Sequence, residues 1–325
     1  MKGIKIKGIG AYTPPLIVTN DDLSKLVDTN DEWIKTRTGI SERRITEGED
    51  TSELAIKAVK KALDRSQLKG EDIDLIIVAT VTPDNYTPSV SCLVQKEIGA
   101  KRAIAFDINA ACTGFVFALN IASTMMKNSS EIKNALVIGS ETLSKIVNWE
   151  DRSTCVLFGD GSGAIVLSKD EYESKDLYFY IKSVGEKGDC LYIGAENVDN
   201  PFVENKIEKY KKISMKGGEV FKFATSVMCK AINKVVEESN ISIDDIDYII
   251  PHQANYRIIE YASRKVNVPI DKFYINLERY GNTSSASIPI ALDEMVERGL
   301  LKEGMKIIIV GFGGGLTYGS ALIEL

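Results

Sequence analysis

The sequence predicts an α/β fold built from two similar halves that share one core. Strand-like apolar runs, such as 75–80, 135–140 and 306–312, alternate with helical stretches such as 51–66 along the 325 residues. A second observation is an internal repeat at an offset of 173 residues. Two such units are expected to stack around a pseudo-twofold axis, which places loops from both halves at one central cleft.

The repeat can be followed element by element. QLKGEDIDLIIVAT (67–80) falls on NISIDDIDYIIPHQ (240–253), and Ala58 in the preceding helix falls on Ala231. Near the same offset, NALVIGS (134–140) resembles MKIIIVGF (305–312), and GSGAIVL (161–167) resembles YGSALIEL (318–325). The pattern D-D-I-D is common in sequences where a helix leads into an apolar strand, so one match alone is weak evidence. Three matches in order favour a duplication. We expect halves at residues 1–170 and 171–325.

Composition excludes several classes of protein. The net charge is −6, so the chain lacks the overall positive charge that would favour nucleic acid or an anionic membrane as a partner. The first residues, MKGIKIKGIGAY, lack the apolar core of a signal peptide, and no apolar run approaches the roughly 20 residues that span a bilayer. Five cysteines without a CxxC pair suggest neither a disulfide framework nor a zinc site. We expect a cytoplasmic protein without a bound metal.

Cys112 is the candidate nucleophile. In RAIAFDINAACTGFVFALNIASTMM (102–126), a strand-like start gives way at small residues to a helical run that begins near this cysteine. A thiol at a helix amino terminus feels the positive end of the helix dipole, which stabilises the thiolate and lowers its pKa. Small neighbours leave room for a thioester substrate. The alternative is an inert cysteine buried in an apolar helix.

His252 and Asn282 are the candidate partners of Cys112. His252, the only histidine, follows Pro251 at the carboxyl end of the repeated strand, where α/β sheets place their chemistry. Asn282 lies in a strand–turn–helix connection that corresponds to the Cys112 region of the first half. Each residue also has an ordinary interpretation, an incidental histidine and a turn asparagine. Only the three together favour catalysis.

The glycine-rich end, GFGGGLTYGS (311–320), follows a buried-strand pattern. A phosphate-binding loop is the first alternative, but no Walker lysine follows and the segment runs into a strand, whereas phosphate loops open a helix. We interpret it as a tight turn whose bare backbone N–H groups face an oxyanion beside Cys112.

Six motifs now occur together and in order: NDEWIKTRTGISERR (30–44), DINAACTGF, FGDGSGA, HQAN, YGNTSSAS and GFGGGLTYG. Together they resemble β-ketoacyl-acyl-carrier-protein synthase III, a condensing-enzyme family of the thiolase superfamily, over nearly the whole chain. The resemblance implies a thiolase-like duplicated α/β fold with five layers (α-β-α-β-α), a homodimer, and a catalytic triad of Cys112, His252 and Asn282.

The reaction that the resemblance implies has two halves. Cys112 first attacks an acyl-CoA and releases CoA, while the backbone N–H groups of Cys112 and Gly315 hold the oxyanion. Malonyl-acyl-carrier protein then loses CO₂, and its enolate, stabilised by His252 and Asn282, attacks the acyl-cysteine. The product is a β-ketoacyl-carrier protein that initiates fatty-acid synthesis. The CoA thioester is a substrate, and no cofactor is required.

The resemblance also implies binding residues. Trp33 and Arg152 would enclose the CoA adenine, and Arg37 would contact its phosphates. The acidic acyl carrier protein would dock on a local basic patch formed by Lys222, Arg257, Arg264 and Lys265.

Two positions depart from the family pattern. Thr87, beside Tyr86, precedes Pro88 in the loop that reaches across the dimer, where members restricted to acetyl primers often carry phenylalanine. These two residues would border an acyl pocket larger than an acetyl group needs. Gly218 replaces an asparagine that binds water in many members.

Several alternatives stay open. A single histidine cannot supply the Cys-His-His triad of elongating synthases, and the second catalytic cysteine of thiolases is missing. Type III polyketide synthases, hydroxymethylglutaryl-CoA synthase and a condensing enzyme of secondary metabolism with another acyl-CoA or acceptor are harder to exclude. A non-catalytic scaffold of the same fold is disfavoured by the intact triad.

Overall fold

The computed structural model describes residues 3–170, 177–203 and 207–325. A five-stranded sheet forms from the first half of the chain, in the order β1-β7-β6-β4-β5. Strand β4 runs parallel to β5 and β6, and β7 runs antiparallel to β1 and β6. The strands are β1 (Gly3–Tyr12), β4 (Leu75–Ala79), β5 (Ile104–Ile108), β6 (Asn134–Glu141) and β7 (Gly161–Asp170).

A second sheet of four strands forms from the second half, in the order β11-β12-β13-β8. Strands β11 and β12 are parallel, and β13 is antiparallel to β12 and β8. An isolated bridge between Ile249 and Phe273 lies where the first sheet has its fifth strand. The strands are β8 (Tyr178–Ser183), β11 (Tyr248–Pro251), β12 (Lys306–Gly313) and β13 (Thr317–Glu324).

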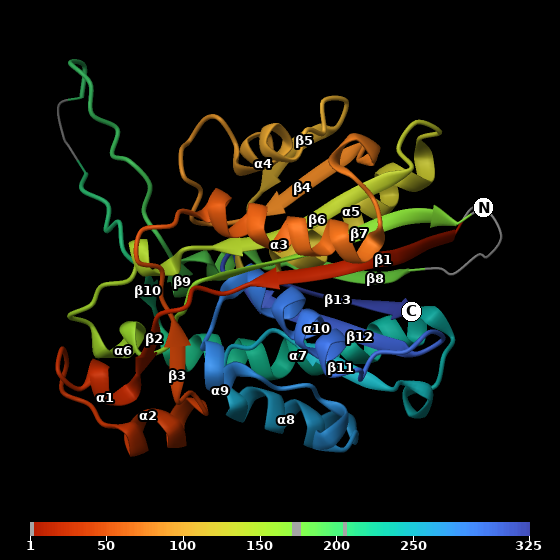
Figure 1. Ribbon diagram of the computed structural model, residues 1–325. Helices are drawn as coiled ribbons and strands as arrows, with labels where there is room; N and C mark the ends of the chain where they lie inside the picture. The colour runs from red at the N-terminus through yellow and green to blue at the C-terminus, as the bar shows by residue number, and fades with distance from the viewer. Residues whose placement is uncertain (1–2, 171–176, 204–206) are drawn as a thin grey trace.

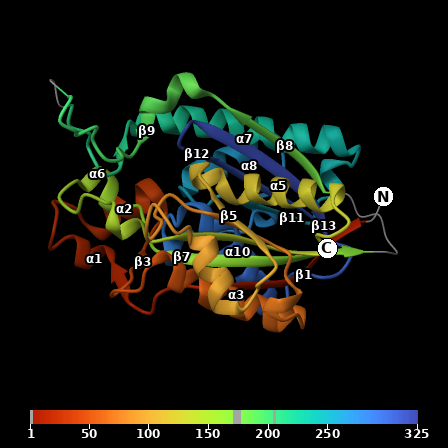
Figure 2. The ribbon, with the colours of Figure 1, turned by 90° about the horizontal axis from the view of Figure 1, so that it is seen from above.

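The two sheets and three layers of helices form a five-layered molecule, which confirms the predicted fold (Figure 1). Helices α5 (Gly114–Asn128) and α10 (Ser287–Glu297) share one apolar cluster with the inner faces of both sheets. Helices α3 (Thr51–Ser66) and α4 (Val90–Ile98) cover the outer face of the first sheet. Helices α7 (Gly217–Ser239) and α8 (Tyr256–Val266) cover the second, so that α3 and α7 lie on opposite sides in Figure 2.

Side-chain alternation along the strands explains these layers. Leu75 and Ile77 of β4 belong to the cluster between the sheets, whereas Ile76 and Val78 pack toward α3 and α4. Successive side chains of a strand point to opposite faces, and strands buried on both faces are apolar throughout. The uninterrupted apolar runs in the sequence therefore belong to strands that are covered on both sides.

The predicted repeat is present in the backbone. Helices α3 and α7 both end on a residue with left-handed backbone, Gln67 (φ 59°) and Asn240 (φ 55°), which are 173 positions apart. A short 3-10 turn follows each helix, η1 (Gly70–Asp72) and η5 (Ile243–Asp245), and then strand β4 or β11. The repeat therefore reflects two equivalent structural units.

Helix α3 shows how local sequence fixes an element. Asp50 caps its amino terminus and forms a capping box with Glu53. Its buried face includes Leu54, Ala58 and Ala62, spaced by four residues as a one-sided helix requires.

The remaining elements are short. They are β2 (Ile17–Thr19), α1 (Asn20–Leu23), α2 (Asp31–Thr38), β3 (Glu42–Arg44), η2 (Ala111–Thr113), η3 (Leu143–Lys145), α6 (Arg152–Cys155), η4 (Gly185–Cys190), β9 (Leu191–Tyr192), β10 (Ser214–Met215), η6 (Ile270–Lys272), α9 (Leu277–Tyr280) and η7 (Ser284–Ala286). Leu23, Ile34 and Ile40 pack into the core of the second half. The division into domains at residue 170 stays a prediction. Among the described residues, no helix is both long and apolar enough to cross a lipid bilayer.

Candidate active site

Cys112 lies in a sharp turn between β5 and α5. The side-chain Oδ1 of Asn109 accepts a hydrogen bond from the N–H of Ala111 (3.3 Å), and Ala111 has a left-handed backbone (φ 47°). This turn reverses the chain at once, so that η2 places Cys112 before the first residue of α5, with only 8% of its surface exposed. The predicted connection between strand and helix is observed.

Asn282 occupies the same turn in the second half. Its Oδ1 accepts a hydrogen bond from the N–H of Ser284 (2.9 Å), and Ser284 is also left-handed (φ 49°). Asn282 lies 173 positions after Asn109, so Asn282 is the counterpart of Asn109. Because the turn uses the amide oxygen of Asn282, the NH₂ group is the part of this side chain that can donate hydrogen bonds.

The FGDGSGA segment holds the backbone of Asn282. The N–H of Asn282 donates to the carbonyl of Leu157 (2.8 Å), and the N–H of Gly159 donates to the carbonyl of Asn282 (3.0 Å). This motif of the first half therefore fixes a candidate residue of the second.

His252 follows β11 and is buried, with 1% of its surface exposed. Its Nδ1 lies 2.7 Å from the Ser287 hydroxyl, which also accepts a hydrogen bond from the N–H of Gln253 (3.4 Å). Within the described part of the chain, Nδ1 is the one acceptor for the hydroxyl hydrogen of the buried Ser287. Since buried hydroxyl groups donate wherever an acceptor is present, Nδ1 accepts and Nε2 carries the ring proton.

Gln253 connects the histidine loop to the segment before Asn282. Its amide NH₂ donates to the carbonyls of Pro251 (2.7 Å) and Tyr274 (3.1 Å). Its Oε1 accepts from the N–H groups of Asn276 (3.0 Å) and Leu277 (3.2 Å). The glutamine of HQAN is thus a positioning residue.

Glycines of β12 allow Cys112 and His252 to approach each other. A Cβ on Gly311 would lie 3.5 Å from the carbonyl oxygen of Cys112 and 3.8 Å from Cβ of His252, so Gly311 lies between the two. A Cβ on Gly313 would lie 2.6 Å from the backbone nitrogen of Cys112, closer than real atoms come. The glycine-rich end therefore packs directly against the backbone of Cys112.

Backbone N–H groups beside Cys112 are available for an oxyanion. Within the described residues, the N–H groups of Cys112, Gly314 and Gly315 donate to no other backbone group. The glycine in direct contact with Cys112 is Gly313, whereas a Cβ on Gly315 would meet Thr317 first. The assignment of Gly315 as the second donor stays a prediction, and Gly314 is equally free.

The electrostatics of the thiol differ from the expectation. Burial is the main cause that raises the pKa of Cys112 to about 12; Ser284 opposes this rise and the nearby Glu141 carboxylate adds to it. The expected low pKa from the helix dipole was therefore wrong, because loss of hydration outweighs a helix terminus. Burial also lowers the pKa of His252 to about 3, so its imidazole is neutral at physiological pH.

Sequence reasoning missed Glu141, which ends β6 and has no exposed surface. Its carboxylate accepts hydrogen bonds from the Ser284 and Ser285 hydroxyls of η7, across the interface between the two halves. A carboxylate directly after the buried strand NALVIGS was the available signal, since strand ends in α/β sheets carry function.

Comparisons with known proteins agree with this geometry. Residues 106–185 match the family model described as 3-oxoacyl-[acyl-carrier-protein (ACP)] synthase III, and residues 236–325 match the model of its C-terminal part. Over 324 residues, covering 100% of this chain and 99% of the relative, the chain is 58% identical to a beta-ketoacyl-[acyl-carrier-protein] synthase III of Clostridium novyi (strain NT). The chain belongs to this family.

Two further relatives support the assignment. A synthase III of Clostridium acetobutylicum is 56% identical, with 100% of this chain and 99% of the relative covered. The crystal structure of 3-oxoacyl-[acyl-carrier-protein] synthase III from Aquifex aeolicus VF5 is 46% identical, has a TM-score of 0.92, and is matched over 99% of this chain and 100% of that chain. This chain is therefore a condensing acyltransferase with the thiolase fold.

The residues that the family likeness assigns to CoA lie together. The guanidinium of Arg37 lies 4.5 Å from the ring centroid of Trp33, and that of Arg152 lies 5.0 Å from it. Arg152 also donates to the carbonyl of Asp28 (2.7 Å). Both guanidinium groups therefore lie close to the ring of Trp33, and the assignment of the three residues to CoA stays a prediction.

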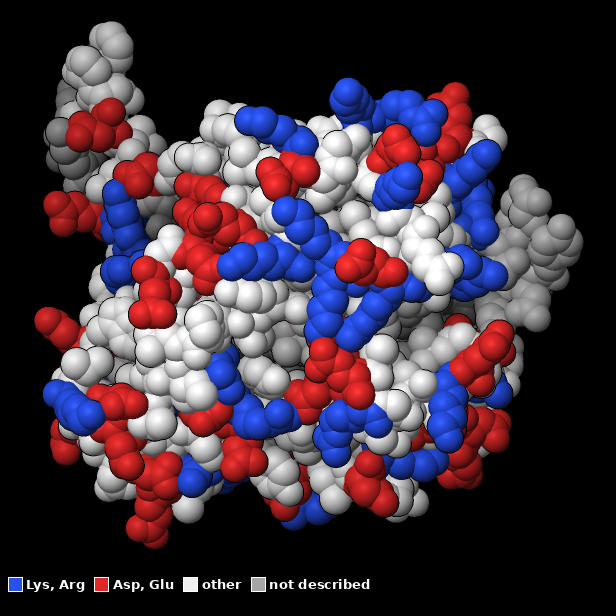
Figure 3. Space-filling view, in the orientation of Figure 1, with Lys and Arg blue, Asp and Glu red and all other residues white. Residues whose placement is uncertain are grey.

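The residues assigned to the carrier protein lie exposed on α7 and α8. Lys222 pairs with Glu219 (3.1 Å) and Arg264 with Glu260 (3.4 Å), whereas the Arg257 guanidinium lies 5.8 Å from the ring centroid of Phe221. Arg257 and Lys265 belong to the same helix, α8. On the face seen in Figure 3, basic and acidic side chains are interspersed, as the small net charge predicts.

Tyr86 and Thr87 do not border Cys112 within this chain. Tyr86 is 80% exposed, and its hydroxyl donates to Glu196 at 3.4 Å, on the surface. Thr87 is exposed as well. Gly218 is exposed in the first turn of α7, where a Cβ would meet nothing within 4 Å. Among the described residues, no group of three or more His, Cys, Asp and Glu side chains is arranged to hold a metal ion.

Proposed function

We propose that this enzyme condenses an acyl-CoA primer, acetyl-CoA or a somewhat larger one, with malonyl-acyl-carrier protein to give a β-ketoacyl-carrier protein. The observation that carries the proposal is the approach of Cys112 and His252 across Gly311 of β12, with Asn282 in a turn equivalent to that before Cys112, in a chain of the synthase III family. The reaction initiates fatty-acid synthesis.

The first half-reaction is acyl transfer to Cys112. The sulfur attacks the acyl carbon of the CoA thioester, the C–S bond to CoA breaks, and CoA leaves. The oxyanion of the tetrahedral intermediate accepts hydrogen bonds from the N–H of Cys112 and from Gly315 of the glycine turn, which are free for it. Such donors act in a dry site, where they stabilise charge strongly.

The second half-reaction is decarboxylation and condensation. Loss of CO₂ from the malonyl group leaves an enolate, whose oxygen accepts hydrogen bonds from Nε2–H of His252 and from the NH₂ of Asn282. The enolate carbon attacks the acyl-cysteine, and Cys112 leaves as a thiolate. Since the pKa of His252 is about 3, the imidazole serves as a neutral donor and not as a base.

Binding of the substrates is proposed for two surfaces. Trp33, Arg37 and Arg152 hold the adenine and phosphates of CoA, because a flat base stacks on aromatic and guanidinium planes and phosphates prefer arginine. The exposed α7–α8 surface with Lys222, Arg257, Arg264 and Lys265 receives the acidic carrier protein. Neither half-reaction as written requires a metal or redox cofactor, and we place the enzyme in the cytoplasm, where its CoA substrate is made.

A homodimer is proposed from the edge of the first sheet. Strand β5 is an edge strand, and Ile104 in it is 50% exposed. An open apolar edge is an unusual surface for a monomer, and a second copy could cover it. In that dimer Tyr86 and Thr87 would reach the acyl pocket of the partner. Light scattering after gel filtration tests this, and a monomer at micromolar concentration would contradict it.

The experiment that tests the function is mass spectrometry of the intact protein after incubation with acyl-CoAs from acetyl to long-chain. An adduct that peptide digestion maps to Cys112, and that is absent from Cys112→Ala, is the expected result and ranks the primers. No adduct with any donor would favour a non-catalytic scaffold.

A further inference from the structure

The Thr317 hydroxyl group joins the Cys112 turn to the glycine turn (residues 314–316) of the second half. Thr317 is buried and begins β13. Its Oγ1 donates to the carbonyls of Ala110 (3.1 Å) and Gly314 (3.1 Å), which share its single hydrogen, and lies 3.0 Å from the Thr113 hydroxyl. Ala110 and Thr113 flank Cys112 in the chain. The reaction described above does not use this side chain.

The carbonyl of Gly314 depends on this hydroxyl more than the carbonyl of Ala110 does. Ala110 also accepts a hydrogen bond from the N–H of Thr113 (3.2 Å). In the part of the chain that the structure describes, no backbone N–H donates to the carbonyl of Gly314. Because a peptide unit is planar, holding this carbonyl also fixes the plane that joins Gly314 to Gly315. Thr317 therefore fixes the turn that carries the free N–H groups of both glycines.

The two halves of the chain make the corresponding contact in different ways. The turns before β7 and β13 are counterparts, since residues 161–167 align with residues 318–325. The first of these turns holds Asn282 through two backbone hydrogen bonds, which occupy N–H groups. The second is attached to the Cys112 turn through the side chain of Thr317. Because a side chain replaces the backbone pairing, the N–H groups beside Cys112 stay available for an oxyanion.

The outer end of the glycine turn is anchored separately. The N–H of Val184 donates to the carbonyl of Leu316 (2.7 Å), and the N–H of Leu316 donates to the carbonyl of Val184 (3.2 Å). Removal of the Thr317 hydroxyl therefore releases only the inner end of the turn, which faces Cys112. We expect such a variant to keep the fold and to lose the position of the turn.

We propose that Thr317 is a positioning residue that holds the glycine turn beside Cys112 for the oxyanion of the thioester. The donors to this oxyanion come from the two halves of the chain, and the Thr317 hydroxyl is hydrogen-bonded to both. Oriented donors stabilise a developing charge only where they already point at it. Thr317 itself touches no reacting atom. The inference deepens the proposed function and rests on it.

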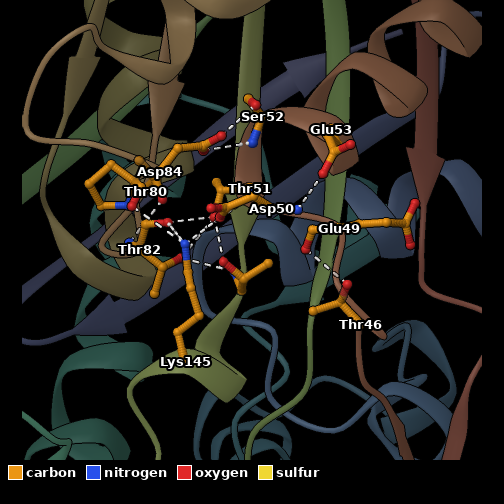
Figure 4. A network of polar contacts seen from close by, with 12 residues as sticks. Thr46, Glu49, Asp50, Thr51, Ser52, Glu53, Thr80, Thr82, Asp84 and Lys145 are labelled. Carbon is orange, nitrogen blue, oxygen red and sulfur yellow. Dashed lines mark hydrogen bonds and ion pairs between the residues drawn. The ribbon is translucent and has the colours of Figure 1, made fainter.

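A second buried threonine makes a similar contact and provides a comparison. The Thr51 hydroxyl donates to the carbonyl of Thr82, in the loop after β4, and Nζ of Lys145 donates to the same carbonyl (3.1 Å), as Figure 4 shows. The carbonyl of Thr82 therefore keeps a donor when the Thr51 hydroxyl is removed. The described contacts leave the carbonyl of Gly314 without one when Thr317 loses its hydroxyl.

Single-turnover acylation by saturating acetyl-CoA, followed by mass spectrometry of the intact protein, tests this role. Thr317→Val keeps the shape of the side chain and removes the hydroxyl, whereas Thr317→Ser keeps the hydroxyl. Loss of the partner of a buried carbonyl shifts an equilibrium by about 5- to 160-fold, so we expect Thr317→Val to acylate at least about fivefold and at most about 160-fold more slowly. Thr317→Ser is expected to stay within about threefold of the wild type.

Two control variants separate this effect from a general loss of stability. Thr51→Val makes the same chemical change at the comparable threonine. Ser320→Ala removes another buried hydroxyl of β13, which donates to the carbonyl of Ala231 (2.8 Å). Both are expected to lose stability in chemical denaturation but to acylate within about threefold of the wild type. If Thr317→Val does not fold, Thr317→Ala takes its place with the same expected slowing.

Decarboxylation of malonyl-carrier protein provides a readout that loss of the oxyanion turn alone leaves unchanged. It is measured in the Cys112→Ala background, where the enolate depends on His252 and Asn282 and no acyl oxyanion forms. Adding Thr317→Val to this background is expected to change the rate by less than about twofold. Equal loss of acylation and decarboxylation, a wild-type rate of acylation in Thr317→Val, or equally slow acylation in Thr317→Ser would overturn the proposal. Absence of an adduct on the wild type would instead contradict the proposed function.

Discussion

Replacing Ser287 with alanine removes the hydroxyl group that is hydrogen-bonded to Nδ1 of His252. The hydrogen bond between Ser287 and Nδ1 is 2.7 Å long and buried. A buried hydrogen bond of this kind contributes about 0.5–1.5 kcal/mol net, which corresponds to about a 2- to 13-fold preference for the ring with its proton on Nε2. Complete loss of an oriented donor costs about 10²- to 10³-fold, which sets the upper bound. An even mixture of tautomers in Ser287→Ala lowers the share of rings with the proton on Nε2 from about 67–93% to about half, so we expect decarboxylation of malonyl-carrier protein to slow about 1.3- to 1.9-fold, while acylation of Cys112 is unchanged.

The assay for this prediction exploits the single histidine of the chain. In protein labelled with ¹⁵N-histidine, long-range ¹H–¹⁵N spectra report which ring nitrogen carries the proton. The wild type is expected to show one tautomer, protonated on Nε2, and Ser287→Ala a mixture of two. Ser285→Ala serves as the control. A wild-type ring protonated on Nδ1, or equal loss of both half-reactions in Ser287→Ala, would refute this reasoning.

Three further predictions follow from the site. Gly313→Ala places a Cβ 2.6 Å from the backbone nitrogen of Cys112, and such overpacking costs about 1–3 kcal/mol; chemical denaturation should show this loss together with slower acylation, and a variant of full stability and rate would contradict the contact. The pKa of His252 is about 3 in the folded protein and about 6.5 in the unfolded chain. Between these two pH values only the unfolded chain binds the proton, so the free energy of unfolding decreases as the pH falls below 6.5. Between pH 6.5 and 4.5 the wild type should lose up to about 2.7 kcal/mol more than His252→Gln; parallel curves for the two proteins would contradict this. Trp33→Ala should raise the KM for acyl-CoA about 5- to 150-fold, since base stacking contributes about 1–3 kcal/mol, with kcat nearly unchanged; an unchanged KM would remove Trp33 from the CoA site.

The repeat was the most informative feature of the sequence. Because Gln67 and Asn240 end equivalent helices and Asn109 and Asn282 start equivalent turns, the offset of 173 residues predicted the fold and the paired connections of the site. These features are local: they depend on turn chemistry and on the alternation of apolar strands and helices. A single sequence carries such signals directly.

Features that depend on tertiary approach were not predictable. The contact between Glu141 and Ser284 arises only when the two halves face each other. Ser284 and Ser287 belong to YGNTSSAS, but the motif does not reveal that they contact Glu141 and His252. The pKa of Cys112 was predicted in the wrong direction, because a sequence shows the helix terminus but not the burial of the thiol. Gly315 stays a prediction as the second oxyanion donor, and the close packing of Gly313 against Cys112 is seen only in the structure.

The most direct test of the central claim is a chase of the isolated acyl-enzyme. The protein is acylated with an acyl-CoA, freed of CoA and mixed with malonyl-carrier protein, and the masses of both proteins are followed in one experiment. Loss of the adduct from Cys112, with the same rate of appearance of a β-ketoacyl group on the carrier protein, is the predicted result. An adduct on Cys112 that malonyl-carrier protein leaves untouched, or a product formed by the Cys112→Ala variant, would contradict the account.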